Sequence, residues 1–86
     1  MEIRSGAKRI LQYLKNRVIQ HGDLSAQFAI DYAELAKELS LDSSGYCRVC
    51  CQYLQEKSYI AFIRREGDIR IVALKAAGID FLEATT

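Results

Sequence analysis

The sequence predicts a small α+β domain in which three helices precede a β-hairpin and a further helix closes the chain. Apolar residues recur at spacings of three and four over residues 3–18 and 32–39, which is the period of an α-helix. Residues 59–64 and 69–74 are instead rich in aromatic and β-branched side chains, and Glu66-Gly67-Asp68 lies between them as a glycine-centred turn. With 86 residues, half of them hydrophobic, the chain is long enough for one domain with its own core.

The first elements are predicted from apolar spacing and from capping residues. The apolar positions from Ile3 to Val18 predict a first amphipathic helix, which ends at His21-Gly22, where glycine supplies the left-handed stop. A polar loop follows, and residues 28–30 form a short extended piece. Asp31 and Glu34 then have the spacing of a capping box, which predicts the start of a second helix of about nine residues.

The later elements follow from turn residues. Residues 40–44 form a turn in which Ser43 or Ser44 caps a third helix that runs to about Lys57. The hairpin comes next, and a short helix over residues 75–83 closes the chain. The predicted order is therefore helix, short strand, helix, turn, helix, hairpin and helix, in a single domain that covers residues 1–86.

This order resembles the winged helix-turn-helix domains of prokaryotic transcriptional regulators, and the resemblance covers nearly the whole chain. It is carried by three stretches, YAELAKELSL, YLQEKSYIAFIRREGDIRIVAL and ALKAAGIDFLEA. The last is similar to the Leu-Thr-x-x-Gly-x-x-Phe/Tyr-Leu pattern that often follows the wing in this family. Lys75 stands in place of the threonine, and Ser58 stands where the family usually has glycine. The positions that fit the pattern are Leu74, Gly78, Phe81 and Leu82.

The resemblance implies that the protein binds double-stranded DNA, with the third helix in the major groove and the hairpin against the backbone. Arginine can pair with guanine and glutamine with adenine, while hydroxyl groups can contact phosphates. Arginines that flank the hairpin turn can hold phosphates or enter the minor groove. The expected DNA-binding residues are Ser44, Tyr46, Arg48 and Gln52 in the third helix and Arg64, Arg65 and Arg70 in the hairpin.

The distribution of charge supports a competing interpretation. Residues 1–22 carry five basic side chains and one acidic, a balance of +4, whereas residues 23–42 carry one basic and five acidic, a balance of −4. The net charge is only +1, which is weak for a DNA-binding protein. The alternative is a protein-interaction or dimerisation module, with Tyr46, Val49 and Tyr53 of the third helix as interface anchors. The arginines of the hairpin favour DNA, which we take as the main hypothesis.

Three cysteines, Cys47, Cys50 and Cys51, fall within five positions of the third helix, and the chain has no others. They can be small apolar side chains in the core, a thiol switch, or ligands of a metal shared between molecules. A zinc site usually needs three or four ligands, and the remaining candidate, His21, lies at the end of another helix. We favour core packing, because free cysteine is among the most buried residue types. No metal and no cofactor are expected.

Enzymatic activity is not expected. The chain has one histidine, no glycine-rich phosphate loop, and no paired carboxylates that the predicted elements would bring together. No segment resembles a secretory signal or a membrane helix. We therefore expect a soluble cytoplasmic protein whose thiols stay reduced.

A homodimer is expected from the size of the predicted DNA site. A single recognition helix contacts only about four to six base pairs, so specificity generally comes from two half-sites and two subunits. The terminal helices are the predicted interface, because Tyr13 lies off the apolar face of the first helix and the last helix carries Ile79 and Phe81. One of these last two side chains is expected near the centre of the interface.

Overall fold

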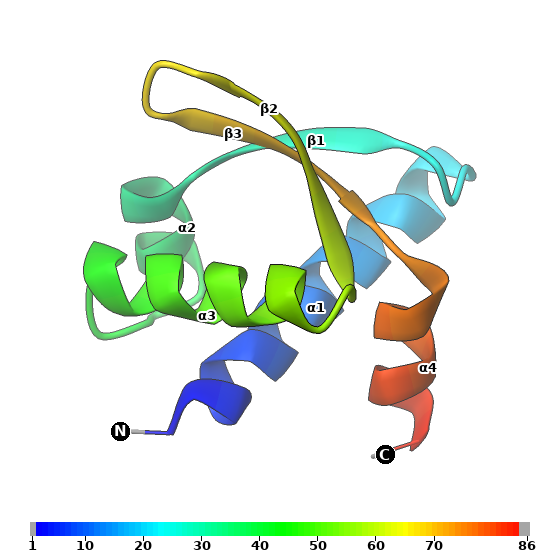
Figure 1. The fold of residues 1–86 in the computed structure, drawn as a ribbon, viewed down its shortest axis with the longest axis horizontal. Coiled ribbons are helices and arrows are strands. Elements are labelled where there is room, and N and C mark those ends of the chain that lie inside the picture. The colour runs from blue at the N-terminus through cyan, green and yellow to red at the C-terminus, as the bar shows by residue number, and fades with distance from the viewer. Residues whose placement is uncertain (1, 85–86) are drawn as a thin grey trace.

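The computed structural model describes residues 2–84, and within them the chain forms an α+β domain of four helices and a three-stranded antiparallel sheet (Figure 1). None of the helices in this part of the chain combines the length and the apolar character needed to cross a bilayer. The elements in chain order are α1 (Ile3–His21), β1 (Gln27–Asp31), α2 (Tyr32–Glu38), α3 (Ser44–Glu56), β2 (Ile60–Glu66), β3 (Ile69–Leu74) and α4 (Ala76–Ala84).

The sheet joins the short first strand to the late hairpin. Its strand order is β1-β3-β2, so β3 is central and the other two strands are edges. β1 pairs with β3 from Gln27 opposite Ala73 to Asp31 opposite Ile69 without a shift in register. β2 pairs with the other side of β3, and its register shifts between Phe62 and Arg64, where a β-bulge interrupts the ladder. The extended piece predicted at residues 28–30 is therefore a full partner in the sheet.

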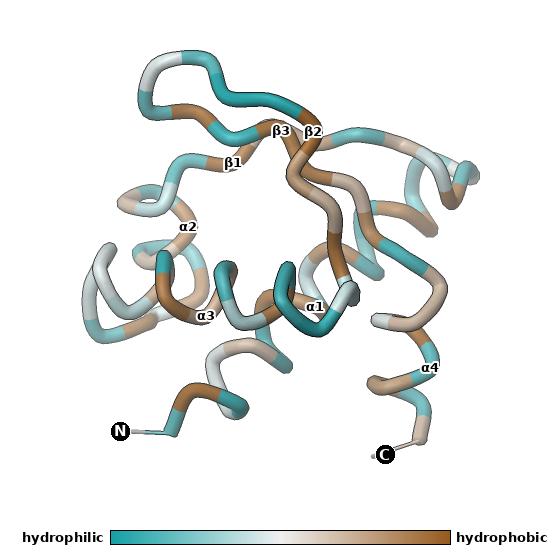
Figure 2. Tube along the Cα trace, in the orientation of Figure 1, coloured by the Kyte–Doolittle hydropathy of each residue, from teal (hydrophilic) through white to brown (hydrophobic). Residues whose placement is uncertain are grey.

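The helices lie on one side of the sheet, and the core fills the space between them (Figure 1). α3 passes in front of α1 in this view, and the segments that face the centre are mostly hydrophobic in Figure 2. β2 divides into an apolar half next to α3 and a polar half towards the turn. The fully buried large side chains come from α1, α3 and the sheet: Ile10, Leu11, Leu14, Cys47, Cys50, Cys51, Leu54, Ile60 and Val72.

The helix ends agree with the predicted capping residues. Gly22 ends α1 with φ 71°, and the Asp31 carboxylate accepts a hydrogen bond from the backbone N–H of Ala33 at 2.8 Å. The Ser43 hydroxyl caps α3 by accepting from the Tyr46 N–H at 3.0 Å. α2 has seven residues rather than about nine, because Ser40 turns the chain with φ 55°.

Two glycines permit close contacts between elements. A Cβ atom on Gly6 of α1 would lie 2.6 Å from the Tyr46 hydroxyl oxygen and 2.7 Å from the Cys50 sulfur, both on α3. A Cβ atom on Gly78 of α4 would lie 2.5 Å from the backbone oxygen of Tyr59. The glycine of the pattern after the hairpin therefore has a steric reason, because α4 lies directly against the chain that leads into β2.

Candidate functional site

Most of the predicted α3 residues lie on the outer surface of the helix. Ser44, Arg48 and Gln52 are all exposed, and their spacing of four residues places them along one side of the helix. The middle of this surface also contains Gly45 and Val49, which the prediction of DNA-binding residues omitted. Their spacing to Gln52 of seven and three residues places all three on one helical stripe, which was the signal available in the sequence.

Gly45 is unlike the two glycines at close contacts, because nothing in the fold requires it. The nearest atom to a Cβ built on Gly45 is the Ser43 hydroxyl oxygen, at an ordinary 3.7 Å. Glycine inside a helix lowers stability relative to alanine, so an unforced glycine is a cost to the fold. What it provides is a bare stretch of backbone at the first turn of α3, which a ligand can approach closely.

The structure corrects the assignment of Tyr46 to this outer surface. Its ring is half-buried, and its hydroxyl donates to the Glu2 backbone oxygen at 2.5 Å and accepts from the Gly6 N–H at 3.1 Å. Tyr46 therefore fixes the start of α1 against α3 and is not available to a ligand of the outer surface. The sequence analysis missed this role because the partners are backbone atoms of a distant helix.

In the hairpin, Arg65 and Arg70 face each other directly across β2 and β3. Side chains at such positions lie on the same face of a sheet, and like charges there are destabilising. Both guanidinium groups donate to the backbone oxygen of Gly67, at 2.9 Å from Arg65 and 3.3 Å from Arg70. Arg70 also lies over the Tyr32 ring of α2, 5.2 Å from its centroid, so the pair is on the helical side of the sheet.

Arg64 is separated from this arginine pair. It lies opposite Ile71, one residue before Arg65, so strand alternation places it on the other face of the hairpin. Its Nε atom forms an exposed ion pair with Glu66, 2.7 Å from Oε2. Among the predicted hairpin residues, the structure therefore brings Arg65 and Arg70 together. Arg64 pairs instead with Glu66 on the opposite face of the hairpin.

A hollow of about 270 Å³ connects the hairpin to the start of α3. Ser44 of α3 and Arg70 of β3 both line it, so two predicted residues that are far apart in the sequence share one surface. Asp31 and Asp68 also line the hollow, together with Tyr32 and Ala33, so its charge is mixed. Across this hollow Ser44 and Arg70 link the exposed stripe of α3 to the arginine pair. We treat the two together as the candidate site and call it the α3–hairpin surface: Ser44, Gly45, Arg48, Val49, Gln52, Arg65 and Arg70.

The three cysteines lie on the opposite side of α3, in the core. Each has 0% exposure, and each is a free thiol. The hydrogen bond with Cys47, and then burial, raise the pKa of the Cys51 thiol above its usual range, and burial raises that of Cys50. Cys50 also donates a hydrogen bond to the Ile3 backbone oxygen at 3.5 Å. Their position is the one that core packing requires, and residues 2–84 contain no group of side chains arranged to hold a metal ion.

The residues expected at a terminal-helix dimer interface are partly engaged within the domain. Phe81 is half-buried and stacks on Tyr59 with ring centroids 4.8 Å apart. The side chains of Arg4 and Lys8 lie over the Phe81 ring, at 5.6 and 5.9 Å from its centroid. Ile79 is half-buried against the same core.

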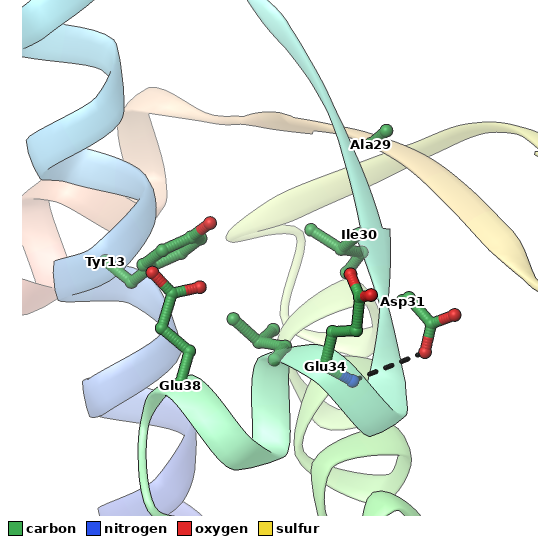
Figure 3. A pocket seen from close by; sticks show the side chains of 7 residues that line it. Tyr13, Ala29, Ile30, Asp31, Glu34 and Glu38 are labelled. Carbon is green, nitrogen blue, oxygen red and sulfur yellow. Dashed lines mark hydrogen bonds between the residues drawn. The ribbon is translucent and has the colours of Figure 1, made fainter.

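Tyr13 borders a different region, where β1, α1 and α2 meet (Figure 3). A small hollow of about 50 Å³ lies there, and its rim carries the carboxylates of Asp31, Glu34 and Glu38. An adjoining hollow of about 390 Å³ shares Tyr13 and Glu38 and is also lined by Arg17. This region is acidic and lacks the arginine pair, so it is distinct in chemistry from the α3–hairpin surface.

Comparisons of the chain with protein-family models, with curated proteins and with solved structures gave no match. The structure defines a small α+β domain in which an exposed helix and an arginine-bearing hairpin border one hollow. The chemistry of this surface is therefore the observation from which a function can be proposed.

Proposed function

We propose that the protein is a small DNA-binding regulator of the winged helix-turn-helix type. In this proposal α3 enters the major groove, and the β2–β3 hairpin, the wing, holds the sugar-phosphate backbone. Arg48 and Gln52 supply groups that can pair with base edges, and Ser44 supplies a hydroxyl for a phosphate. The protein acts as a homodimer on two half-sites, and its chemistry is binding rather than catalysis.

The observation that carries the proposal is the arginine pair of the wing. Arg65 and Arg70 are held opposite each other on the side of the sheet that bears the helices, although their charges repel. An anion between or beside them removes this repulsion. A phosphate of a bound duplex is such an anion, and Ser44, which borders the same hollow as Arg70, could donate to it as well.

The exposed glycine of α3 supports the same proposal. Gly45 lowers helix stability, and no packing contact requires it. It carries no side chain, so a phosphate could approach the first turn of α3 closely there, where N–H groups that the Ser43 cap does not use are suitable donors. A side chain at this position would keep the helix further from a DNA backbone.

Fluorescence anisotropy with a labelled duplex of random sequence tests the proposal. We expect a dissociation constant in the micromolar range or tighter at low salt, and weaker binding as salt rises, because bound phosphates release counterions. The double change Arg65→Ala with Arg70→Ala should weaken binding to all sequences and reduce the salt slope by roughly 1–2. Arg64→Ala is the matched control, because this residue is on the other face of the same hairpin. Negligible binding at low ionic strength would reject the proposal.

A protein-interaction module is the second candidate, and exposed apolar side chains favour it. Val49 in the middle of the α3 stripe is 42% exposed, and Ile63 at the β2 bulge is 43% exposed. Exposed aliphatic side chains are suited to an interface between proteins. In that case Val49→Asp removes binding of the partner, whereas the arginine pair contributes little.

A further inference from the structure

The two edges of the sheet differ in how they are protected against pairing. The edge strand β2 has a bulge between Phe62 and Arg64 and a run of charged residues towards its end, both of which hinder the addition of another strand. The edge strand β1 has neither, because its register with β3 is regular and Asp31, its last residue, is the only charged one. β1 is therefore the edge at which a further strand can be added.

The outer edge of β1 is accessible within the part of the chain that the structure describes. In Figure 3 β1 runs in front of the rest of the sheet, and the side chains that line the small hollow lie between β1, α1 and α2. Alternate residues of an antiparallel edge strand direct their N–H and C=O groups away from the neighbouring strand. β1 thus presents two or three residues with outward backbone groups, and Ala29 at its centre has a small exposed side chain.

The two ends of this edge carry opposite charge. At the start of the strand, the Arg17 guanidinium lies over the Phe28 ring, 4.8 Å from its centroid. At the other end, Asp31 and Glu34 place two carboxylates beside the start of α2. An antiparallel copy of the same edge, rotated by a two-fold axis, puts the basic end of each strand against the acidic end of the other. The edge is therefore complementary to itself in charge.

We propose that β1 pairs in antiparallel fashion with β1 of a second copy of this chain. The two-fold axis passes near Ala29, so that Gln27 lies opposite the partner's Asp31 and its amide can donate to that carboxylate. Arg17 of each subunit then approaches Glu34 of the partner subunit. The product is a continuous six-stranded sheet with the helices of both subunits on the same side, because such an axis is perpendicular to the sheet.

This interface differs from the terminal-helix interface expected from the sequence. It uses backbone groups and charges around β1, and it leaves α4 outside the contact. It also goes beyond DNA binding, since it can form in a protein-interaction module equally well. Its test therefore uses the protein alone, without DNA. A dimer that forms through another surface leaves the proposed function untouched, whereas a monomer removes the homodimer from it but not the DNA contacts of α3 and the hairpin.

Sedimentation velocity over about 5–300 µM protein, with two charge-reversal variants, tests the pairing. Arg17→Glu creates a repulsion with the partner's Glu34, and Glu34→Lys creates one with the partner's Arg17. We expect each variant alone to associate about tenfold more weakly than wild type, because two like-charge contacts form in every symmetric dimer. Mixed in equal amounts, the two variants should associate about as well as wild type, since both contacts are then between opposite charges.

Mixing the two variants distinguishes loss of the interface from loss of folding. Two misfolded variants would not regain association when mixed. Lys8→Glu is the matched control, since Lys8 is on α1 but lies over Phe81 rather than beside β1. Amide hydrogen exchange gives a second measure, in which protection of β1 should rise with protein concentration while that of β2 stays constant. A monomer throughout the concentration range overturns the proposal. A dimer that Phe81→Asp abolishes and the charge variants do not weaken also overturns it.

Discussion

The two faces of α3 differ in what determines their residues. The inner face consists of Cys47, Cys50, Cys51 and Leu54, all with 0% exposure, and it packs so closely on α1 that only glycine fits at position 6. The outer face carries exposed polar residues and a glycine that no contact within the domain requires. Packing explains the inner face completely and the outer face not at all. The outer residues are therefore the part of this helix to which the proposed DNA interface is assigned.

The largest expected effect comes from placing the same methyl group on each face. Gly6→Ala should lower the free energy of unfolding by about 2–3 kcal/mol, because its Cβ atom overlaps the Tyr46 hydroxyl and the Cys50 sulfur. Gly45→Ala should leave it unchanged or raise it by up to about 1 kcal/mol, since the site is open and alanine is the better helix former. Urea unfolding followed by circular dichroism measures both. Equal losses in the two variants would remove the distinction between the faces.

Stability at alkaline pH tests whether the inner face is a packed thiol core. The pKa of Cys51 is raised above its ordinary value of 9.0, so the folded state retains this proton where the unfolded state loses it. The contribution of this retained proton to the free energy of unfolding is thus present below pH 9 and is lost as the pH rises further. From pH 9 to 10, the free energy of unfolding of the wild type should fall by about 1 kcal/mol more than that of Cys51→Ala, because the unfolded thiol is half deprotonated at the start of this range. Parallel pH profiles for the two proteins would mean that this thiol titrates freely.

The smallest expected effect on the free energy of unfolding comes from Ser58, which lies just beyond the end of α3 and belongs to neither face. Ser58 has φ 61°, a left-handed conformation in which glycine is preferred, and the following N–H of Tyr59 donates back to the Leu54 oxygen at 2.9 Å. Ser58→Gly should therefore raise the free energy of unfolding by roughly 0.5–1 kcal/mol. Ser44→Gly, within the helix, should lower it instead. Thermal unfolding of the two variants decides between gain and loss.

The sequence predicted the elements of this fold better than their contacts. Apolar spacing and the capping residues Asp31 and Ser43 located the helices, because these signals are local. The same reasoning did not locate the pairing of β1 with β3, since the partner strand lies about forty residues away. It also did not locate the bulge in β2, because no local residue pattern marks it.

The candidate site was predicted in part, for the same reason. Arg48 and Gln52 were placed correctly on the exposed stripe, because helical periodicity determines it. Tyr46 was misplaced, since its hydroxyl is held by the backbone of α1. The opposition of Arg65 and Arg70 follows from the turn, because Glu66 pairs with Ile69 and only Gly67 and Asp68 remain in the loop. The sequence placed Glu66 in the turn as well and gave no register, so it did not separate this pair from Arg64.

The most direct test of the account is a map of amide chemical shifts as duplex DNA is added at low salt. An ¹⁵N-labelled protein and a duplex of about 15 base pairs suffice, because the chain has only 86 residues. We predict the largest changes at Ser44, Gly45, Arg48 and Gln52 and at the Gly67 turn that the arginine pair contacts, with small changes along the buried face of α3. Shifts confined to α1 and α4, or none at all, would contradict a DNA interface on the outer face of α3.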